Sequence, residues 1–154
     1  MIIEGDKTYS DMLSKKIIEL GCEAFQVFDA KEAKKFLLED KIQPVLVLCS
    51  ANLPDCSGVN FFRETLVRNL NLNICMLINK IERLELLEAV QLGVVDFMSR
   101  SVRPSFYSEK LSSLVRLGQS RAAKKNVLAQ NNSHTKAEQI VSAMKLQNIQ
   151  KKPA

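Results

Sequence analysis

The side chains best placed for chemistry follow a short apolar run near the middle of the chain. Residues 45–49 are all apolar, and Ser50, Asn52 and Asp55 come soon after them. A run of this kind, opened by a proline and too short for a helix, predicts a strand buried on both faces of a parallel sheet. Ligands of such sheets bind just beyond the carboxyl ends of the strands. Ser50 is therefore predicted where this fold would carry out its chemistry.

Ser50 and Asp55 each allow a chemical and a structural interpretation. The hydroxyl of Ser50 could accept a phosphoryl group, but it is not ionised at neutral pH and no base is adjacent to it in the sequence. The alternative is a strand-end cap that forms a local hydrogen bond. Asp55 is the nearest carboxylate, and an aspartate after a proline is also ordinary turn chemistry. Both pairs of interpretations stay open at this point.

The cysteines indicate neither a metal site nor a disulfide framework. Cys22, Cys49, Cys56 and Cys75 lack the C-x-x-C and Cys/His spacings of such sites. Cys49 and Cys75 fall inside predicted strands, where cysteine behaves as a small hydrophobic residue. Cys56 has no flanking base or cation that would activate its thiol. We expect free thiols, no metal ligands and no catalytic residues among them.

The rest of the chain alternates short apolar runs with amphipathic stretches. Strands are predicted at 1–3, 24–28, 45–49, 74–78 and 95–98, and helices at 8–20, after Asp29, at 59–69, 82–92 and 104–117. This alternation predicts an α/β fold, a doubly wound (βα)5 parallel sheet with helices on both faces. Residues 4–8 hold a single glycine, which weighs against a nucleotide-binding loop after the first strand.

Charge divides the chain into a neutral body and a basic tail. The net charge is +5 over 154 residues, but residues 118–154 alone carry +6 and residues 1–117 carry −1. We therefore predict a domain at 1–117 and a tail at 118–154 that is partly helical or disordered. The tail has no aromatic residue for stacking on bases, so nucleic acid is not an expected partner. No signal peptide or membrane span is evident, and a cytoplasmic location is expected.

Over residues 1–117 the order of elements and their loop motifs resemble the receiver domains of bacterial two-component response regulators. The motifs that carry the resemblance are at 2–6, 46–50, 53–58, 76–80 and 92–97, and include the Leu-Pro-Asp turn and the Leu-Gly-x-x-Asp-Phe segment. The resemblance implies a flavodoxin-like strand order, 2-1-3-4-5. It also implies a phosphorylation site at the carboxyl ends of strands one, three, four and five.

This chain departs from the family at most positions of that site. The family uses two acids for Mg²⁺, an aspartate as phosphoryl acceptor, a Thr or Ser as switch hydroxyl and a lysine. The corresponding residues here are Glu4 and Gly5 (with Asp6 displaced by one), Ser50, Ile78 and Arg100, while Asn52 falls where the family offers a backbone carbonyl to the metal. We expect no Mg²⁺ or other cofactor, and an ion pair between Arg100 and Glu4 across the pocket.

The resemblance therefore implies a pseudo-receiver, a module for protein interaction in bacterial signal transduction rather than an enzyme with a small-molecule substrate. Its expected partner surface combines the helix at 82–92, the strand at 95–98 and the helix at 104–117, through Leu84, Leu87, Phe97 and Phe106, with Phe97 also at the switch-aromatic position. The tail or a second copy of the chain could contribute. One alternative keeps phosphorylation at Ser50 or Asp55. A weaker one is a basic-tailed adaptor for nucleic acid or membrane.

Overall fold

The computed structural model describes residues 1–39, 43–66, 72–79, 83–101 and 106–124. Contacts within the chain divide it into two units, Met1–Gly118 and Gln119–Ala154. In the second unit residues 119–124 are helical, and the rest of the predicted tail lies outside the described residues. The fold below is that of the first unit.

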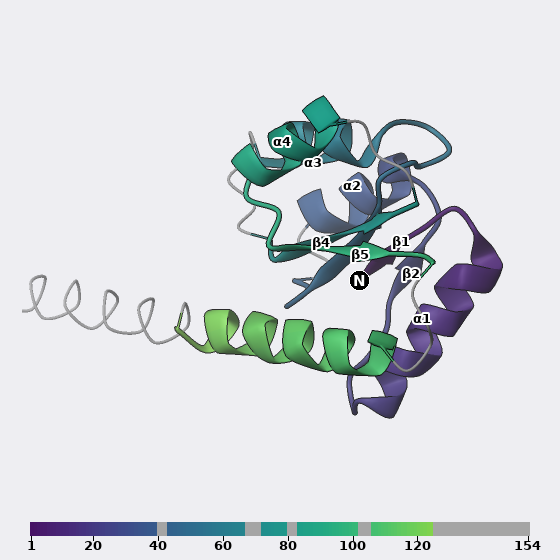
Figure 1. The fold of residues 1–154 in the computed structure, drawn as a ribbon, viewed down its shortest axis with the longest axis vertical. Coiled ribbons are helices and arrows are strands. Elements are labelled where there is room, and N and C mark those ends of the chain that lie inside the picture. The colour runs from purple at the N-terminus through teal and green to yellow at the C-terminus, as the bar shows by residue number, and fades with distance from the viewer. Residues whose placement is uncertain (40–42, 67–71, 80–82, 102–105, 125–154) are drawn as a thin grey trace, which may run out of the picture. The chain divides into compact units, whose positions relative to one another are not determined.

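The first unit contains a five-stranded parallel sheet in the order β2-β1-β3-β4-β5 (Figure 1). Its strands are β1 (Ile2–Ile3), β2 (Gln26–Val27), β3 (Val47–Ser50), β4 (Ile74–Ile78) and β5 (Asp96–Ser99). The predicted fold class and strand order are confirmed. All four residues of β3 are buried, as expected for a central strand with helices on both faces.

The helices of this unit form one layer on each face of the sheet (Figure 1). They are α1 (Lys7–Glu19), α2 (Ala30–Leu38), α3 (Gly58–Leu66), α4 (Arg83–Gln91) and the helical residues 106–118. Helices α2, α3 and α4 cover one face, and α1 with residues 106–118 covers the other. Among the described residues no helix combines the length and the apolar character that crossing a membrane requires.

The alternation of side chains along the strands produces two separate cores. Ile3, Cys49 and Met76 are register partners across three strands and belong to the core under α2, α3 and α4. The preceding residues, Ile2, Leu48 and Cys75, belong to the core under α1 and residues 106–118. Because successive side chains of a strand point to opposite faces, each strand supplies both cores.

The third strand begins and ends later than predicted. Val45 is partly exposed, and its carbonyl accepts a hydrogen bond from the Asn73 side chain instead of a neighbouring strand. Pairing with β1 and β4 runs through Ser50, which is the last residue of β3 and is buried. Ser50 is therefore inside the sheet rather than just beyond it, which is a correction to the predicted boundary.

The helical residues 106–118 lie against the sheet through Tyr107, Leu111, Leu114 and Gly118. The three larger side chains are buried in the core under this helix. At Gly118 a Cβ atom would overlap the backbone carbonyl of Val45. A side chain at this position would therefore push the helix away from the beginning of the third strand.

Candidate functional site

Glu4 and Ser50 lie side by side at the carboxyl end of the sheet. Ile3 is the register partner of Cys49, so the next residues of the two chains, Glu4 and Ser50, are neighbours. Glu4 is 2% exposed and Ser50 is 3% exposed. The Ser50 hydroxyl donates a hydrogen bond to the Asn52 carbonyl over 3.0 Å. Ser50 thus forms the local cap that was one of its two sequence-based interpretations.

Arg100, which follows β5, brings a positive charge to Glu4 and Asp6. Its guanidinium donates to Asp6 Oδ2 over 3.0 Å and lies 3.8 Å from Glu4 Oε1. The ion pair predicted between Arg100 and Glu4 is present, and Asp6 is the closer partner. The guanidinium also lies 4.2 Å from the centre of the Tyr9 ring, a cation–π distance. The Arg100 side chain is mostly buried, so these charges are less screened than a surface pair.

The Glu4 side chain points toward the loop that follows β1. Its Oε1 accepts a hydrogen bond of 2.9 Å from the Asp6 amide, while its buried Oε2 has no hydrogen-bond partner among the described residues. A buried carboxylate is costly unless an opposite charge compensates it. Arg100 is the cation that does so here.

A proline occupies the space that a second acid would need. A Cβ atom at Gly5 would lie 2.8 Å from Cγ and 3.0 Å from Cδ of Pro54. Carbon atoms do not approach this closely without displacement, so a larger side chain at residue 5 would have to move the loop after β3. With Pro54 in this place, residue 5 has no room for the acidic side chain that the receiver family carries there. Sequence reasoning did not detect this contact.

Asp55 joins the loop after β3 to the beginning of α2. Its two carboxylate oxygens accept hydrogen bonds of 2.9 Å each from the amides of Ala30 and Lys31. Asp29, after which this helix was predicted to begin, caps it by accepting a hydrogen bond from the Glu32 amide. Asp55 was interpreted from its local turn only, because nothing in the sequence links it to a helix that begins 25 residues earlier. These contacts favour a structural role for Asp55.

We expect the substitution Asp55→Asn to lower the free energy of unfolding by about 1 kcal/mol at pH 7, since an amide can accept only one of the two hydrogen bonds. Partial burial raises the pKa of the Asp55 carboxyl, but the hydrogen bonds from the Ala30 and Lys31 amides outweigh it and hold the pKa below its usual value. A depressed pKa stabilises the fold above the unfolded-state value and stops doing so as the pH falls through the folded-state value.

The difference between the wild type and Asp55→Asn should therefore be complete at neutral pH and shrink below about pH 4. Urea denaturation followed by circular dichroism at several pH values measures it. Glu109→Gln, which neutralises an exposed carboxylate on the helical residues 106–118, is the control and should show no such dependence. A pH-independent difference would mean that the carboxylate charge at residue 55 is not what holds α2.

The remaining residues of the pocket do not fit the Mg²⁺ that receiver domains use. Mg²⁺ needs several oxygen ligands in near-octahedral geometry. Here Asp6 is paired with Arg100, one oxygen of Glu4 accepts the Asp6 amide, and the Ser50 hydroxyl donates to a backbone carbonyl. Ile78, half-buried at the end of β4, offers no ligand. No three His, Cys, Asp or Glu side chains in the described parts of the chain are grouped to hold a metal ion.

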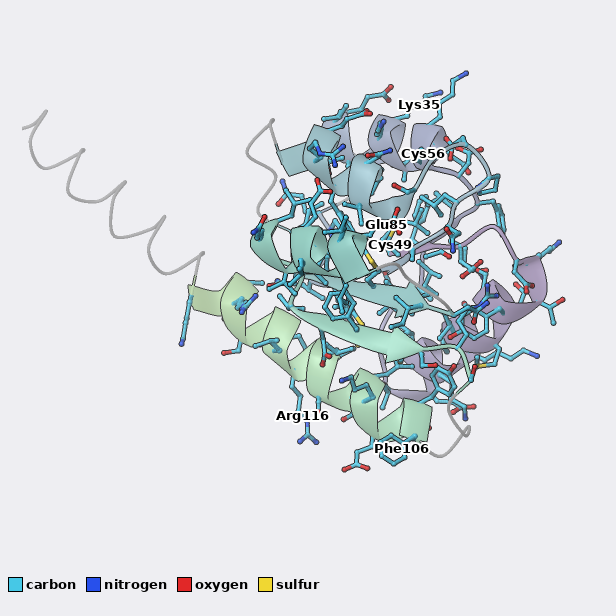
Figure 2. All side chains as sticks on the ribbon, turned by 45° about the horizontal axis from the view of Figure 1, so that its top comes forward. Lys35, Cys49, Cys56, Glu85, Phe106 and Arg116 are labelled. Atoms are coloured by element: carbon cyan, nitrogen blue, oxygen red, sulfur yellow. The ribbon has the colours of Figure 1, made fainter. Side chains whose placement is uncertain are left out.

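The residues predicted for a partner surface lie on both sides of β5, an edge strand of the sheet. Leu84 and Leu87 on α4 are 80% and 50% exposed, and Val90, which the prediction missed, is also exposed on the same helix. On the other side Phe106 is exposed and extends away from the helix that carries it (Figure 2). Phe97 is half-buried and packs against the core under α4.

A small cavity lies between β5 and the helical residues 106–118. Its volume is about 140 Å³, and it is lined by Phe97, Met98, Ser99, Phe106, Tyr107 and Lys110. The lining is mostly apolar, and Lys110 forms an ion pair of 2.6 Å with Asp96. This cavity therefore has a mostly apolar lining, with the Lys110–Asp96 ion pair at its margin.

Comparison with known proteins found structural similarity only. No family model and no curated protein matches the sequence. A response regulator receiver domain protein (CheY-like) from Methanospirillum hungatei JF-1 superposes with a TM-score of 0.68 at 17% identity, over 78% of this chain and 94% of that one. This chain has the receiver-domain fold.

Two further solved structures share this receiver fold. The signal receiver domain of a signal transduction histidine kinase from Syntrophus aciditrophicus has a TM-score of 0.64 at 19% identity, covering 75% of this chain and 87% of that one. The chemotaxis response regulator CheY4 of Vibrio cholerae has a TM-score of 0.64 at 16% identity, covering 73% and 94%. At these identities the likeness describes the fold, and the functions in these names belong to those proteins.

Proposed function

We propose that this chain is a receiver-fold module that binds a protein partner in cytoplasmic signal transduction of the bacterial two-component type, without phosphorylation of an aspartate. The observation that carries the proposal is the row of exposed apolar side chains on α4. Leu84, Leu87 and Val90 are spaced three residues apart and all face solvent. A helix on a globular domain normally needs one apolar face for its core.

Helix α4 has a second apolar face in addition to its buried one. Ala89 is fully buried in the core, and α4 also contacts α3, whereas Leu84, Leu87 and Val90 remain exposed. Contiguous exposed apolar side chains are typical of surfaces that bind other proteins. This arrangement supports a docking role for α4.

The other side of β5 extends the proposed surface. Phe106 and the cavity beside it offer room for an apolar side chain, and the Lys110–Asp96 pair at the margin can orient polar groups. Aromatic anchors next to small pockets are the usual energetic centres of protein interfaces. We therefore propose a protein partner that places apolar side chains on α4 and beside Phe106. A second copy of this chain is the alternative partner.

The contacts of the pocket support a partner role that does not depend on phosphorylation. Ser50 is buried and its hydroxyl is engaged with Asn52, and both oxygens of Asp55 hold α2. The Ser50 hydroxyl is therefore not free to attack an incoming phosphoryl group, and phosphorylation of Asp55 would have to break its hydrogen bonds to α2. An in-line transfer needs a free nucleophilic oxygen together with positioned positive charge.

We expect the double substitution Leu84→Asp with Leu87→Asp to reduce capture of the partner at least about tenfold, because two apolar anchors become charged. Affinity capture from a bacterial lysate with the full chain as bait, quantified by mass spectrometry, measures it. Analytical ultracentrifugation of the same variants tests self-association.

Ile18→Asp is the matched control, since Ile18 is 59% exposed but lies on α1, on the opposite face of the sheet. All variants should stay folded, because exposed substitutions usually change stability by less than about 0.5 kcal/mol. Capture that survives the double substitution, or that Ile18→Asp abolishes equally, would place the partner elsewhere.

A further inference from the structure

The contacts of Arg100 continue beyond the carboxylates to a pair of tyrosines. The Tyr9 ring lies under the guanidinium, and its hydroxyl is 2.9 Å from the hydroxyl of Tyr107. Tyr107 donates its own proton to the Ser99 carbonyl over 3.0 Å. A phenol has one proton to donate, so Tyr9 must be the donor to Tyr107. The order of contacts is thus Arg100, Tyr9, Tyr107 and Ser99.

We call this series of contacts a circuit, because it starts at Arg100 and returns to Ser99, the residue before it in the sequence. Arg100 directly follows Ser99 at the end of β5, Tyr9 belongs to α1, and Tyr107 belongs to the helical residues 106–118. Tyr107 also lines the cavity beside Phe106. The circuit therefore connects the acidic pocket at the carboxyl end of the sheet to the cavity next to β5.

Inside the pocket Arg100 has the role that a bound cation would have. It lies within ion-pair distance of both Glu4 and Asp6, and Tyr9 covers another side of its guanidinium. The two carboxylates carry more negative charge than one arginine balances, and Glu4 Oε2 has no hydrogen-bond partner in the described part of the chain. Among the described residues Arg100 is the cation within ion-pair distance of these two carboxylates, so its removal would leave both without that counter-charge.

We propose that Arg100 is the resident cation of this pocket, in place of a divalent metal, and that through Tyr9 and Tyr107 it holds the cavity beside Phe106 in one fixed state. A divalent ion would have to displace the guanidinium from the Glu4 and Asp6 carboxylates and would meet its charge at close range. The exclusion of a divalent metal by Arg100 depends only on these contacts. The effect of Arg100 on the cavity rests on the proposed function only in taking the cavity as part of a docking surface.

The chain offers a direct optical probe of this circuit. It contains two tyrosines and no tryptophan, so its tyrosine fluorescence comes only from Tyr9 and Tyr107. We would titrate the full-length wild type and Arg100→Gln with MgCl₂ at constant ionic strength. Fluorescence and the amide resonances of Glu4 and Asp6 would be recorded together.

Arg100→Gln is expected to show a saturable response with a midpoint of about 1 mM, the range of weak carboxylate sites. The wild type should need at least about ten times more Mg²⁺, which corresponds to 1.4 kcal/mol. Arg116→Gln, which removes an exposed arginine from the helical residues 106–118 (Figure 2), should behave like the wild type. Equal midpoints in the wild type and Arg100→Gln would overturn the metal exclusion.

Tyr9→Phe tests the connection to the cavity separately. It keeps the ring beside Arg100 but removes the hydroxyl that donates to Tyr107. We expect its Mg²⁺ response to match that of the wild type while the amide resonances of Phe106, Tyr107 and Lys110 shift. Arg100→Gln should shift the same resonances before any Mg²⁺ is added.

Unchanged resonances at Phe106 and Tyr107 in both variants would overturn the connection. Should Arg100→Gln fail to fold, Arg100→Lys is the second variant; it keeps the charge and loses the planar stack, and should shift the tyrosine emission. These outcomes are independent of the partner experiment. Capture that depends on Leu84 and Leu87 can hold or fail whatever Arg100 does.

Discussion

Replacing Ser50 with aspartate is expected to lower the free energy of unfolding by about 3 kcal/mol or more and to leave the protein unphosphorylated. Ser50 is buried beside Glu4, so the new carboxylate would be desolvated next to an existing one. It would also face the Asn52 carbonyl, which now accepts the Ser50 proton. Arg100 is already divided between Glu4 and Asp6 and cannot compensate a third carboxylate fully.

The pH dependence of this variant has a definite sign. Burial beside a like charge raises the folded-state pKa of an aspartate above its unfolded value of about 3.9. The penalty is complete above the raised folded-state pKa and disappears as the pH falls below the unfolded one. Urea denaturation at pH 7 and pH 5 should therefore show a smaller difference from the wild type at pH 5.

Ser50→Asn is the matched control for that experiment. Asparagine has nearly the same shape as aspartate, but it is uncharged and its amide can donate a hydrogen bond to the Asn52 carbonyl. Ser50→Asn should cost clearly less than Ser50→Asp. Incubation of the wild type and both variants with Mg²⁺ and acetyl phosphate, followed by intact mass measurement, should show no added phosphoryl group. A phosphoryl group on the wild type would support the alternative of a switch at Ser50 or Asp55. One on Ser50→Asp alone would mean that only the acceptor is missing.

The substitution Gly58→Ala is expected to destabilise the fold by about 3 kcal/mol, at the upper end of what overpacking costs. A Cβ atom at this position would overlap the Ser50 carbonyl oxygen and lie 3.2 Å from the Cα of Ala51. Both are backbone atoms of the strand end and its loop, so neither can rotate away as a side chain would. The Gly58 amide also donates to the Ala51 carbonyl over 2.8 Å, which keeps α3 close to that strand.

Urea denaturation of Gly58→Ala measures this effect. Asn60→Ala, at an exposed position of the same helix, is the control and should change stability by less than about 0.5 kcal/mol. A Gly58→Ala variant as stable as the control would show that the β3–α3 junction can relax.

Local patterns were sufficient to predict the sheet and part of the site. The apolar run at 74–78 became β4 with the predicted bounds, because a fully buried parallel strand has a distinct composition. The pairing of Arg100 with Glu4 followed from the resemblance to receiver domains, which assigns both residues to one pocket. The third strand was shifted, since the sequence does not reveal that Asn73 binds the Val45 carbonyl.

The parts of the site that could not be predicted depend on contacts between distant segments. Tyr9 and Tyr107 are 98 residues apart, and neither belongs to a motif that would identify it. The contact of Pro54 with Gly5 likewise depends on how a loop closes over a strand end. Val90 was missed because an exposed apolar residue on a helix looks in the sequence like one more core position. Such features require coordinates.

The helical residues 106–118 are held at two separate places. Near the beginning Tyr107 is hydrogen-bonded to Tyr9 and Ser99, and eleven residues later Gly118 fits against the Val45 backbone without space for a side chain. These contacts oppose both sliding of the helix along its axis and rotation about that axis. We therefore expect binding to this surface to need no prior shift between conformations, in which case the measured dissociation constant equals the intrinsic one.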